Sequence, residues 1–315
     1  MEGIKRGGCE WDTSPGKIKP FIPGSSIAGV LSSVNQEYGE DLFSKFINTT
    51  SDNERMSKVT VYDGVLANDS FKISTRDNVA LGERKKKIEA AKFNYEIVET
   101  GAKFILRFEL YQPNNDSRLD MKQCIESFEE LLAYMKSDLV SFGHKTSRGF
   151  GDFKVNYAGK KEFSEDDFEA YLNFDFMSVD KKDLNEIELD QIVDQRFRLE
   201  IKAHQRGPIS IREYNANTDD VDYHHIHCNG NPVIPGTSLS GAFRHNMIHN
   251  LRLMLKGYPS YADMSKKLEA LFGCSADHNH NVGHKSYIRF HESVIENATE
   301  VKMTHVKIDA LQVVL

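Results

Sequence analysis

An eleven-residue stretch that occurs twice constrains the fold of this chain more than any other feature. Residues 21–31 read FIPGSSIAGVL, and residues 233–243 read VIPGTSLSGAF. In each copy a β-branched residue ends a strand, Pro-Gly makes a turn, and two hydroxyl residues are expected to cap the helix that follows. Two copies in a chain of 315 residues indicate that one module has been duplicated.

Apolar residues with the spacing of one helix face follow both turns. These residues are Ile27, Val30, Leu31 and Val34 in the first copy, and Leu239, Ala242, Phe243 and Met247 in the second. The small residues Gly29 and Gly241 predict that each helix packs closely against its neighbour.

The start of each helix is a predicted phosphate site, because free N–H groups and hydroxyls gather there. The predicted contacts are Gly24, Ser25 and Ser26 in the first copy, and Gly236, Thr237 and Ser238 in the second. A strand-turn-helix that binds nothing would have the same sequence.

The net charge of −7 argues against nucleic acid only until its distribution is considered. Residues 161–195 carry twelve acidic and three basic residues, so the rest of the chain is slightly basic. The acidic stretch also contains aromatic residues, which predicts a connector that packs and is partly helical. We therefore expect a first domain over 1–160 and a second over 196–315.

Cysteine usage and hydropathy narrow the class of protein. The four cysteines are far apart, and neither a secretory signal nor an apolar run of membrane-spanning length is present. These features predict a soluble protein of the cytoplasm without a disulfide framework.

Alternation and helical spacing predict further elements. Strands are expected at 59–62, 104–110, 153–155 and 197–203, and a helix at 121–135. Strands and helices that alternate around antiparallel hairpins fit an α+β sandwich of the ferredoxin or RRM type.

A glycine-rich loop over 141–151 follows the predicted helix. Its glycines permit backbone conformations that other residues resist, and its cations suit phosphate. The predicted phosphate contacts in this loop are Gly143, Lys145, Arg148, Gly149 and Gly151. A flexible turn between a helix and a strand is the alternative.

The copies correspond again further along the chain. The Pro-Gly unit repeats at an offset of 212 residues, and Val65-Leu66 matches Val294-Ile295 at an offset of 229.

The second copy therefore has additional residues between helix and strand, and a possible zinc site falls in this interval. Its candidate ligands are Cys274, His278, His280 and His284, and a weaker candidate group is His224, His225, His227 and Cys228. Polar loops are the alternative for both.

The Ile-Pro-Gly-Ser-Ser element, the Arg-Gly-Phe-Gly loop and the ferredoxin-like pattern resemble the RAMP superfamily of CRISPR proteins. Within it, the chain resembles the repeated backbone subunits of type III effector complexes, here with two copies fused. The resemblance implies two tandem RAMP domains, the first without its opening strand and the second without its C-terminal part. It also implies that the protein binds guide RNA, target RNA and other RAMP subunits.

In such subunits an acidic residue shortly before the Pro-Gly element cuts the target RNA with a divalent metal, expected to be Mg²⁺. The resemblance points to Asp12 rather than Glu10 in the first copy. In the second copy it ranks Asp220 first by spacing, with Asp219 and Asp222 as alternatives. The carboxylate would orient a metal-bound water or help activate the ribose 2′-hydroxyl. Solvated loop acids are the alternative.

The resemblance also bears on the basic residues. Lys85 and Lys86 fall where family members carry a protruding hairpin, and would meet RNA phosphates unless they belong to a solvated surface loop. Phe93 and Tyr95 are expected in the core, with base stacking as the alternative. Arg244 matches a basic position of the family after the first helical turn, where the first copy has Ser32 or Ser33.

Three functions follow from these patterns. The first is a guide-binding backbone subunit that cleaves target RNA, and the second is a scaffold of the same architecture without catalysis. The third is an endonuclease that processes guide RNA, although the internal loop and the doubled Pro-Gly unit favour it least.

Overall fold

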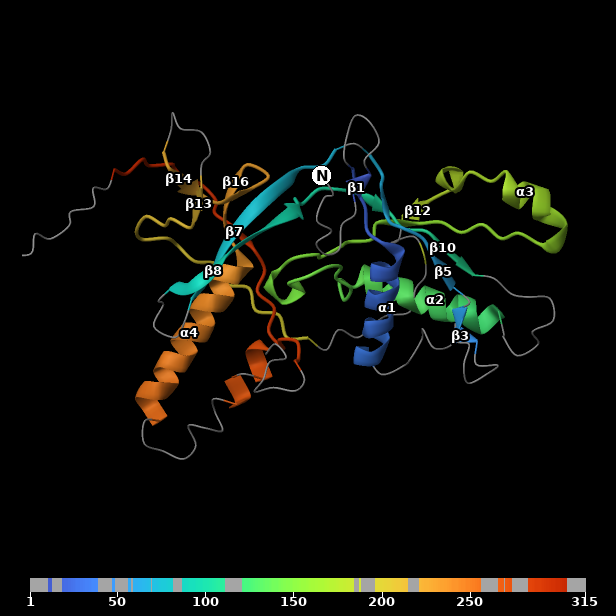
Figure 1. Ribbon diagram of the computed structural model, residues 1–315. Coiled ribbons are helices and arrows are strands. Elements are labelled where there is room, and N and C mark those ends of the chain that lie inside the picture. Colours follow the sequence, from blue (N-terminus) through green and yellow to red (C-terminus); the bar gives the residue numbers. More distant parts are fainter. Residues whose placement is uncertain are drawn as a thin grey trace, which may run out of the picture. The chain divides into compact units, whose positions relative to one another are not determined.

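The computed structural model describes residues 11–12, 19–38, 47–48, 56–57, 59–68, 70–81, 87–110, 121–183, 187, 196–214, 221–255, 266–268, 270–273 and 283–304. The chain forms two compact units (Figure 1). Unit 1 comprises Met1–Phe71 and Ala102–Lys202, and unit 2 comprises Lys72–Gly101 and Ala203–Leu315. The units therefore do not follow the order of the two sequence copies, because residues 72–101 of the first copy belong to unit 2.

Unit 1 combines two long helices with short antiparallel strand pairs, an α+β arrangement. The helices are α1 (Gly24–Tyr38) and α2 (Met121–Lys136). The strand pairs are β1 (Trp11–Asp12) with β2 (Lys19–Pro20), β3 (Ile47–Asn48) with β4 (Met56–Ser57), β5 (Val59–Val61) with β10 (Phe108–Leu110), β6 (Val65–Leu66) with β9 (Phe104–Ile105), and β11 (Tyr157–Ala158) with β12 (Lys182–Asp183).

The core of unit 1 lies between α1, α2 and the sheet strands. Ile27 and Leu31 of α1 are fully buried, and they share one cluster with Leu131 and Met135 of α2. Phe142, at the start of the glycine-rich loop, packs edge-to-face on Phe153 and closes this cluster. The predicted apolar face of the first helix is therefore confirmed.

The acidic connector packs on unit 1, as the aromatic residues predicted, and is partly helical. Its helical segments are η3 (Glu165–Asp167), α3 (Phe168–Leu172) and η4 (Phe176–Ser178). The Arg107 guanidinium lies 4.0 Å from the Tyr62 ring centroid and 3.2 Å from that of Phe176, and it is ion-paired with Glu109. Burial raises the pKa of Glu109, but hydrogen bonds from Tyr62 and Arg107 outweigh burial and hold it below its ordinary value.

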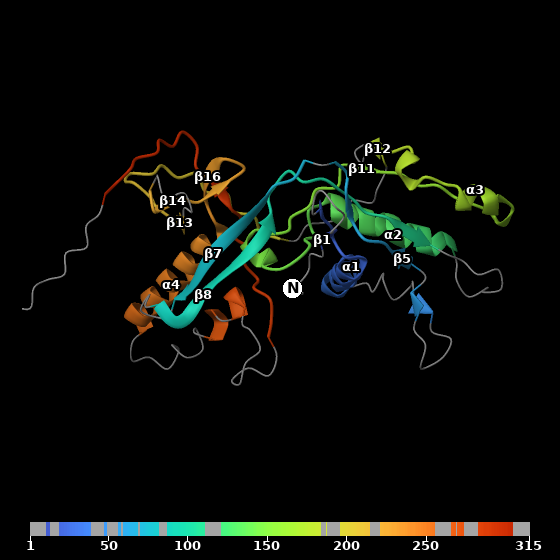
Figure 2. The same cartoon turned by 45° about the horizontal axis from the view of Figure 1, so that its top comes forward.

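Unit 2 contains a long hairpin, a small set of short strands and one long helix (Figure 2). The hairpin strands are β7 (Ile73–Leu81) and β8 (Lys87–Val98), and β7 also lies beside β13. The remaining elements are β13 (Arg212–Tyr214) with β14 (Tyr223–His225), β15 (His227–Cys228) with β16 (Asn231–Ile234), β17 (Ser293–Val294) on β16, and α4 (Gly236–Leu255).

Two predicted strands are absent as strands. Residues 153–155 make no ladder, and only the neighbouring bridge Ser141–Asp152 is formed. The alternating stretch 197–203 forms no strand ladder within the described residues, and Phe197 on its apolar face is 88% exposed. Alternation creates a face that can be buried, but a strand needs a hydrogen-bonding neighbour. No helix in the described part of the chain is long and apolar enough to span a membrane.

Candidate nucleic-acid interface

The two Pro-Gly units make the same backbone hydrogen bonds. The Pro23 carbonyl accepts from the N–H groups of Ser26 and Ile27, at 2.9 and 3.0 Å. The Pro235 carbonyl accepts from Ser238 and Leu239, at 2.9 and 3.1 Å. The repeated sequence therefore builds one local structure twice, a strand that turns directly into a helix.

The strand beside each unit confirms the second sequence correspondence. Ile22 forms an antiparallel bridge with Gly64, and Ile234 pairs in the same way with Ser293. These partners differ by the offsets of 212 and 229 residues found in the sequence. Each helix therefore starts next to an equivalent strand, although the two copies differ in the chain that joins helix and strand.

Gly24 is the glycine that permits close packing in the first copy. A Cβ atom at this position would overlap the carbonyl oxygen of Val61, so only glycine fits at the start of α1. The prediction for Gly29 and Gly241 was wrong, since a Cβ atom at either would meet nothing within 4 Å. Both lie on exposed sides of their helices.

The predicted hydroxyl cap of α1 was also wrong. Helix α1 begins at Gly24, so Ser25 and Ser26 lie within its first turn. The cap is the carboxylate of Asp63, whose Oδ1 accepts a hydrogen bond from the Gly24 N–H at 2.7 Å. A negative charge at this end also complements the helix dipole. The N-terminus of α1 therefore already holds an anion that belongs to the protein.

The N-terminus of α4 differs at the equivalent position. Glu292 precedes the Ile234–Ser293 pair as Asp63 precedes the Ile22–Gly64 bridge, but its carboxylate lies 3.7 Å from Arg76 instead. Within the described residues, the N–H groups of Gly236 and Thr237 meet no acceptor. Arg244 is exposed eight residues, just over two turns, further along the same helix. This helix start therefore has the donors and the cation that a phosphate requires.

The glycine-rich loop is closed by hydrogen bonds between its two ends. The Phe142 N–H donates to the Gly151 carbonyl at 2.8 Å, and the Ser141 hydroxyl donates to Asp152 at 2.9 Å. Positive φ angles occur at Gly143, Lys145, Gly149 and Gly151. At Gly151 a Cβ atom would also overlap the Phe142 carbonyl, so this glycine is required.

Lys145 directly precedes the short helix η2 (Thr146–Arg148) in this loop, and Arg148 is its last residue. Burial, with the nearby charge of Arg148, lowers the pKa of Lys145 to about 8. An anion bound beside Lys145 and Arg148 would stabilise the charged form of the lysine and reduce the repulsion between the two cations. The loop is thus electrostatically suited to a phosphate group.

Only some of the predicted catalytic and basic residues belong to the described part of the chain. Asp12 ends β1 opposite Lys19, on the strand pair that leads into Pro23. Asp222 is exposed next to β14. Glu10, Asp219, Asp220, Lys85 and Lys86 lie outside the described residues. The hairpin that carries the two lysines is formed by β7 and β8, and Phe93 on it is 46% exposed rather than part of the core.

The predicted zinc site stays a prediction, because three of its four candidate ligands lie outside the described residues. Cys274, His278 and His280 lie outside the described residues, while His284 is exposed and its Nδ1 lies 3.1 Å from the Lys285 carbonyl. In the weaker group, His225 accepts from the Ile211 N–H and contacts the Val233 carbonyl, so both ring nitrogens are used by the backbone. No group of three or more metal-binding side chains occurs among the residues searched in the described part.

Sequence reasoning missed Asp63 as the cap of α1 and Arg76 as the partner of Glu292. Asp63-Gly64 reads as a turn, and Arg76 as one of many charged residues in a polar region. The only signal was the repeat itself, since its offset aligns Asp63 with Glu292 and places an acidic residue beside both helix starts.

Comparison with known proteins decides the family. The model of the RAMP superfamily matches residues 15–154 and 207–311, which together make up most of the chain. This protein belongs to the RAMP superfamily. The two matched regions agree with tandem RAMP domains of α+β type, and RAMP membership indicates a CRISPR-associated protein that binds RNA. A search among curated proteins found no match for the chain.

Proposed function

We propose that this RAMP protein is a backbone subunit of a type III CRISPR effector complex, which holds guide RNA and pairs it with target RNA. The observation that carries this proposal is the pair of strand-turn-helix units with matching hydrogen bonds, one in each matched region. A repeated unit suits a repeated ligand, and the phosphates of an RNA strand recur at a regular spacing.

The RNA contacts would be unequal in the two copies. In the second copy, the N–H groups of Gly236 and Thr237, the Ser238 hydroxyl and Arg244 would receive a phosphate. In the first copy Asp63 occupies the N–H of Gly24, so this N–H would not contact RNA, and Ser25 and Ser26 would contribute their hydroxyls. Lys145 and Arg148, together with the backbone at Gly143, Gly149 and Gly151, would form a further contact, and Lys85 and Lys86 another.

Cleavage of the target would depend on Asp12 in the first copy and Asp220 in the second. Each carboxylate would orient the attacking ribose 2′-hydroxyl and accept its proton. A single carboxylate suits Mg²⁺, which is commonly bound by one or two carboxylates together with phosphates of the substrate. When bound, the ion would neutralise charge on the scissile phosphate. Zinc at Cys274, His278, His280 and His284 remains a structural proposal.

The test is to purify the intact chain with its bound RNA, sequence that RNA, and add a matching labelled target with Mg²⁺. We expect guide-like RNA and cleavage that is lost in the Asp12→Ala, Asp220→Ala double variant but retained in the control Asp180→Ala, at an exposed aspartate of the acidic connector. Unchanged cutting by the double variant would remove the cleavage role and leave a scaffold subunit. Cutting of a guide precursor instead of the target would favour the processing endonuclease. If no RNA binds, the proposal fails as a whole.

A further inference from the structure

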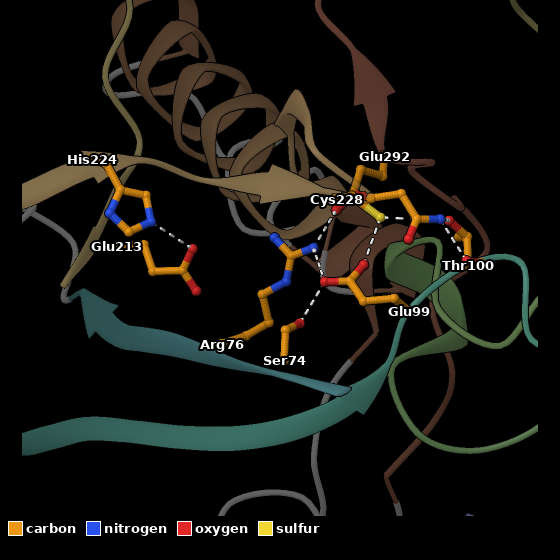
Figure 3. A network of polar contacts seen from close by, with 9 residues as sticks. Ser74, Arg76, Glu99, Thr100, Glu213, His224, Cys228 and Glu292 are labelled. Carbon is orange, nitrogen blue, oxygen red and sulfur yellow. Dashed lines mark hydrogen bonds and ion pairs between the residues drawn. The ribbon is translucent and has the colours of Figure 1, made fainter. Parts of the chain in front are cut away.

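A network of buried polar side chains lies at the base of the β7–β8 hairpin (Figure 3). Its centre is Glu99, which is 4% exposed and follows β8 directly. Glu99 accepts hydrogen bonds from the Ser74 hydroxyl at 2.5 Å and from the Cys228 thiol at 2.8 Å. Arg76, 3% exposed, lies 3.8 Å from Glu99 and 3.7 Å from Glu292.

The network joins residues from both sequence copies within unit 2. Ser74, Arg76, Glu99 and Thr100 come from the first copy, whereas Cys228, Asn229 and Glu292 come from the second. The Asn229 side chain donates to the carbonyl of Thr100 at 2.5 Å and to its hydroxyl at 2.9 Å. Burial and the hydrogen bond to Glu99 raise the pKa of Cys228 to about 11, so the thiol keeps the proton that it donates.

The second-copy members of this network are attached to the start of α4. Cys228 ends β15, which pairs with β16, and β16 leads through Pro235 into the helix. Glu292 directly precedes Ser293, the partner of Ile234 in β16. Through these connections the hairpin base is tied to the strand-turn-helix of the second copy.

Buried ions are a costly way to obtain stability alone, because desolvation offsets much of their attraction. Their directional hydrogen bonds instead select one arrangement of the groups that they join. Glu99 is contacted by Ser74 and Arg76 of β7 and by Cys228 of β15. A hairpin shifted against the second-copy strands would lose the Cys228 donor, and Arg76 would lose Glu292, which leaves buried charged groups with fewer partners.

We infer that Arg76 and Glu99 are positioning residues, which hold the hairpin of the first copy beside the α4 start of the second so that both contact one RNA strand. The RNA-holding element is then a composite of the two copies. This inference rests on the proposed function. It adds that contacts within unit 2 fix the position of the hairpin relative to the bound RNA.

The experiment uses photo-cross-linking from two positions of the full chain to a labelled oligouridylate. One parent protein carries p-benzoylphenylalanine at Phe93, exposed on the hairpin, and the other carries it at His249, exposed on α4. Arg76→Met and Glu99→Gln are introduced into both parents. The matched controls are Arg206→Met and Glu96→Gln, at exposed residues of the same unit.

We expect Arg76→Met and Glu99→Gln to lower the Phe93 cross-link several-fold while the His249 cross-link is retained, and the controls to lower neither. A purely structural role would lower both cross-links together, in proportion to the folded fraction measured by thermal unfolding. Equal cross-linking from Phe93 in parent and variant proteins would overturn the inference.

A milder pair of variants guards against misfolding. Cys228→Ser keeps a donor for Glu99, whereas Cys228→Ala removes it, so only the second should weaken the Phe93 cross-link. Equal yields from these two variants would count against the network. If neither parent protein cross-links to RNA, RNA binding itself is what fails, and the positioning role falls with it.

Discussion

Helices α1 and α4 begin with the same backbone hydrogen bonds, but the apolar face of α1 is buried and that of α4 is partly exposed. Leu31 of α1 is fully buried, whereas Phe243, its counterpart by the offset of 212, is 48% exposed. The difference lies in the neighbours, since α1 packs against α2 and the described part of unit 2 has a much smaller core around Ile226 and Val233. Local sequence therefore determines how a helix starts, while burial depends on elements far away in the chain.

The acidic residue beside each helix start shows the same divergence. Asp63 accepts a hydrogen bond from the first N–H of α1, whereas Glu292 is ion-paired with Arg76 and does not cap α4. One copy thus uses its carboxylate for stability of the helix, and the other uses it to fasten the hairpin. The predictions below test how far this division extends.

The largest expected effect is on the free energy of unfolding, and it differs between the apolar faces of α1 and α4. Leu31→Ala should destabilise unit 1 by about 2–5 kcal/mol, because it leaves a cavity in a closed core. Phe243→Ala should cost only about 1 kcal/mol, since half of that ring is already in water. Denaturant unfolding followed by fluorescence would measure both, and equal costs would contradict the difference in packing.

The second prediction concerns two glycines of α1. Gly24→Ala should destabilise by about 1–3 kcal/mol, because the new methyl group overlaps the Val61 carbonyl. Gly29→Ala should stabilise by about 0.5–1 kcal/mol, because the site is open and alanine favours a helix. Thermal unfolding of the two variants should shift in opposite directions, and a shift in the same direction would show that the contact at Gly24 is misjudged.

The third prediction tests the carboxylate cap. Asp63→Ala should cost about 1 kcal/mol through loss of the acceptor for the Gly24 N–H. Asp63→Asn keeps an acceptor and should cost less. If both variants unfold like the parent protein, Asp63 is not the cap in solution.

The fourth prediction compares Arg244 with Ser32, its counterpart in the first copy. Arg244→Ala should weaken binding to single-stranded RNA and reduce the slope of log K against log salt by about 0.7, the value for one lost phosphate contact. Ser32→Ala should change neither quantity. Fluorescence anisotropy at several salt concentrations provides the measurement, and an unchanged slope for Arg244→Ala would remove α4 from the interface.

The smallest effect is a dependence on pH. Lys145, with a pKa of about 8, is charged below that pH and neutral above it, so its contribution to RNA binding should fall as the pH rises from about 7 to about 9. Lys145→Arg should remove this part of the pH dependence, because arginine stays protonated. Identical pH profiles for the two proteins would indicate that Lys145 does not contact RNA.

The duplication was predictable because it rests on local chemistry. Pro-Gly and the apolar spacing at Ile27 and Leu31 describe short-range structure, and both were confirmed. The strand beside each unit pairs over a longer distance in the chain, and it was predictable only because the repeat matches it in both copies. The strand expected at 197–203 was wrong for the opposite reason. Its alternation was correct, but pairing depends on a partner that the sequence does not name.

The site was less predictable, because its decisive contacts cross long distances. The Asp63 cap is 39 residues from Gly24, and the hairpin base meets residues of the other copy. Hydroxyls next to a helix start are the usual cap, so Ser25 and Ser26 were the reasonable expectation. Nothing in a single sequence indicates which distant carboxylate will displace them.

The link between the hairpin and the second copy also sets an order for biosynthesis. Thr100 and Cys228, whose side chains lie 3.6 Å apart, are separated by 128 residues. Translation at about 5–20 residues per second leaves the hairpin waiting roughly ten seconds for its partner to leave the ribosome. Unit 1 can mature in that interval, while the hairpin exposes β7 and β8 to chaperones or to other nascent chains until the C-terminal half emerges.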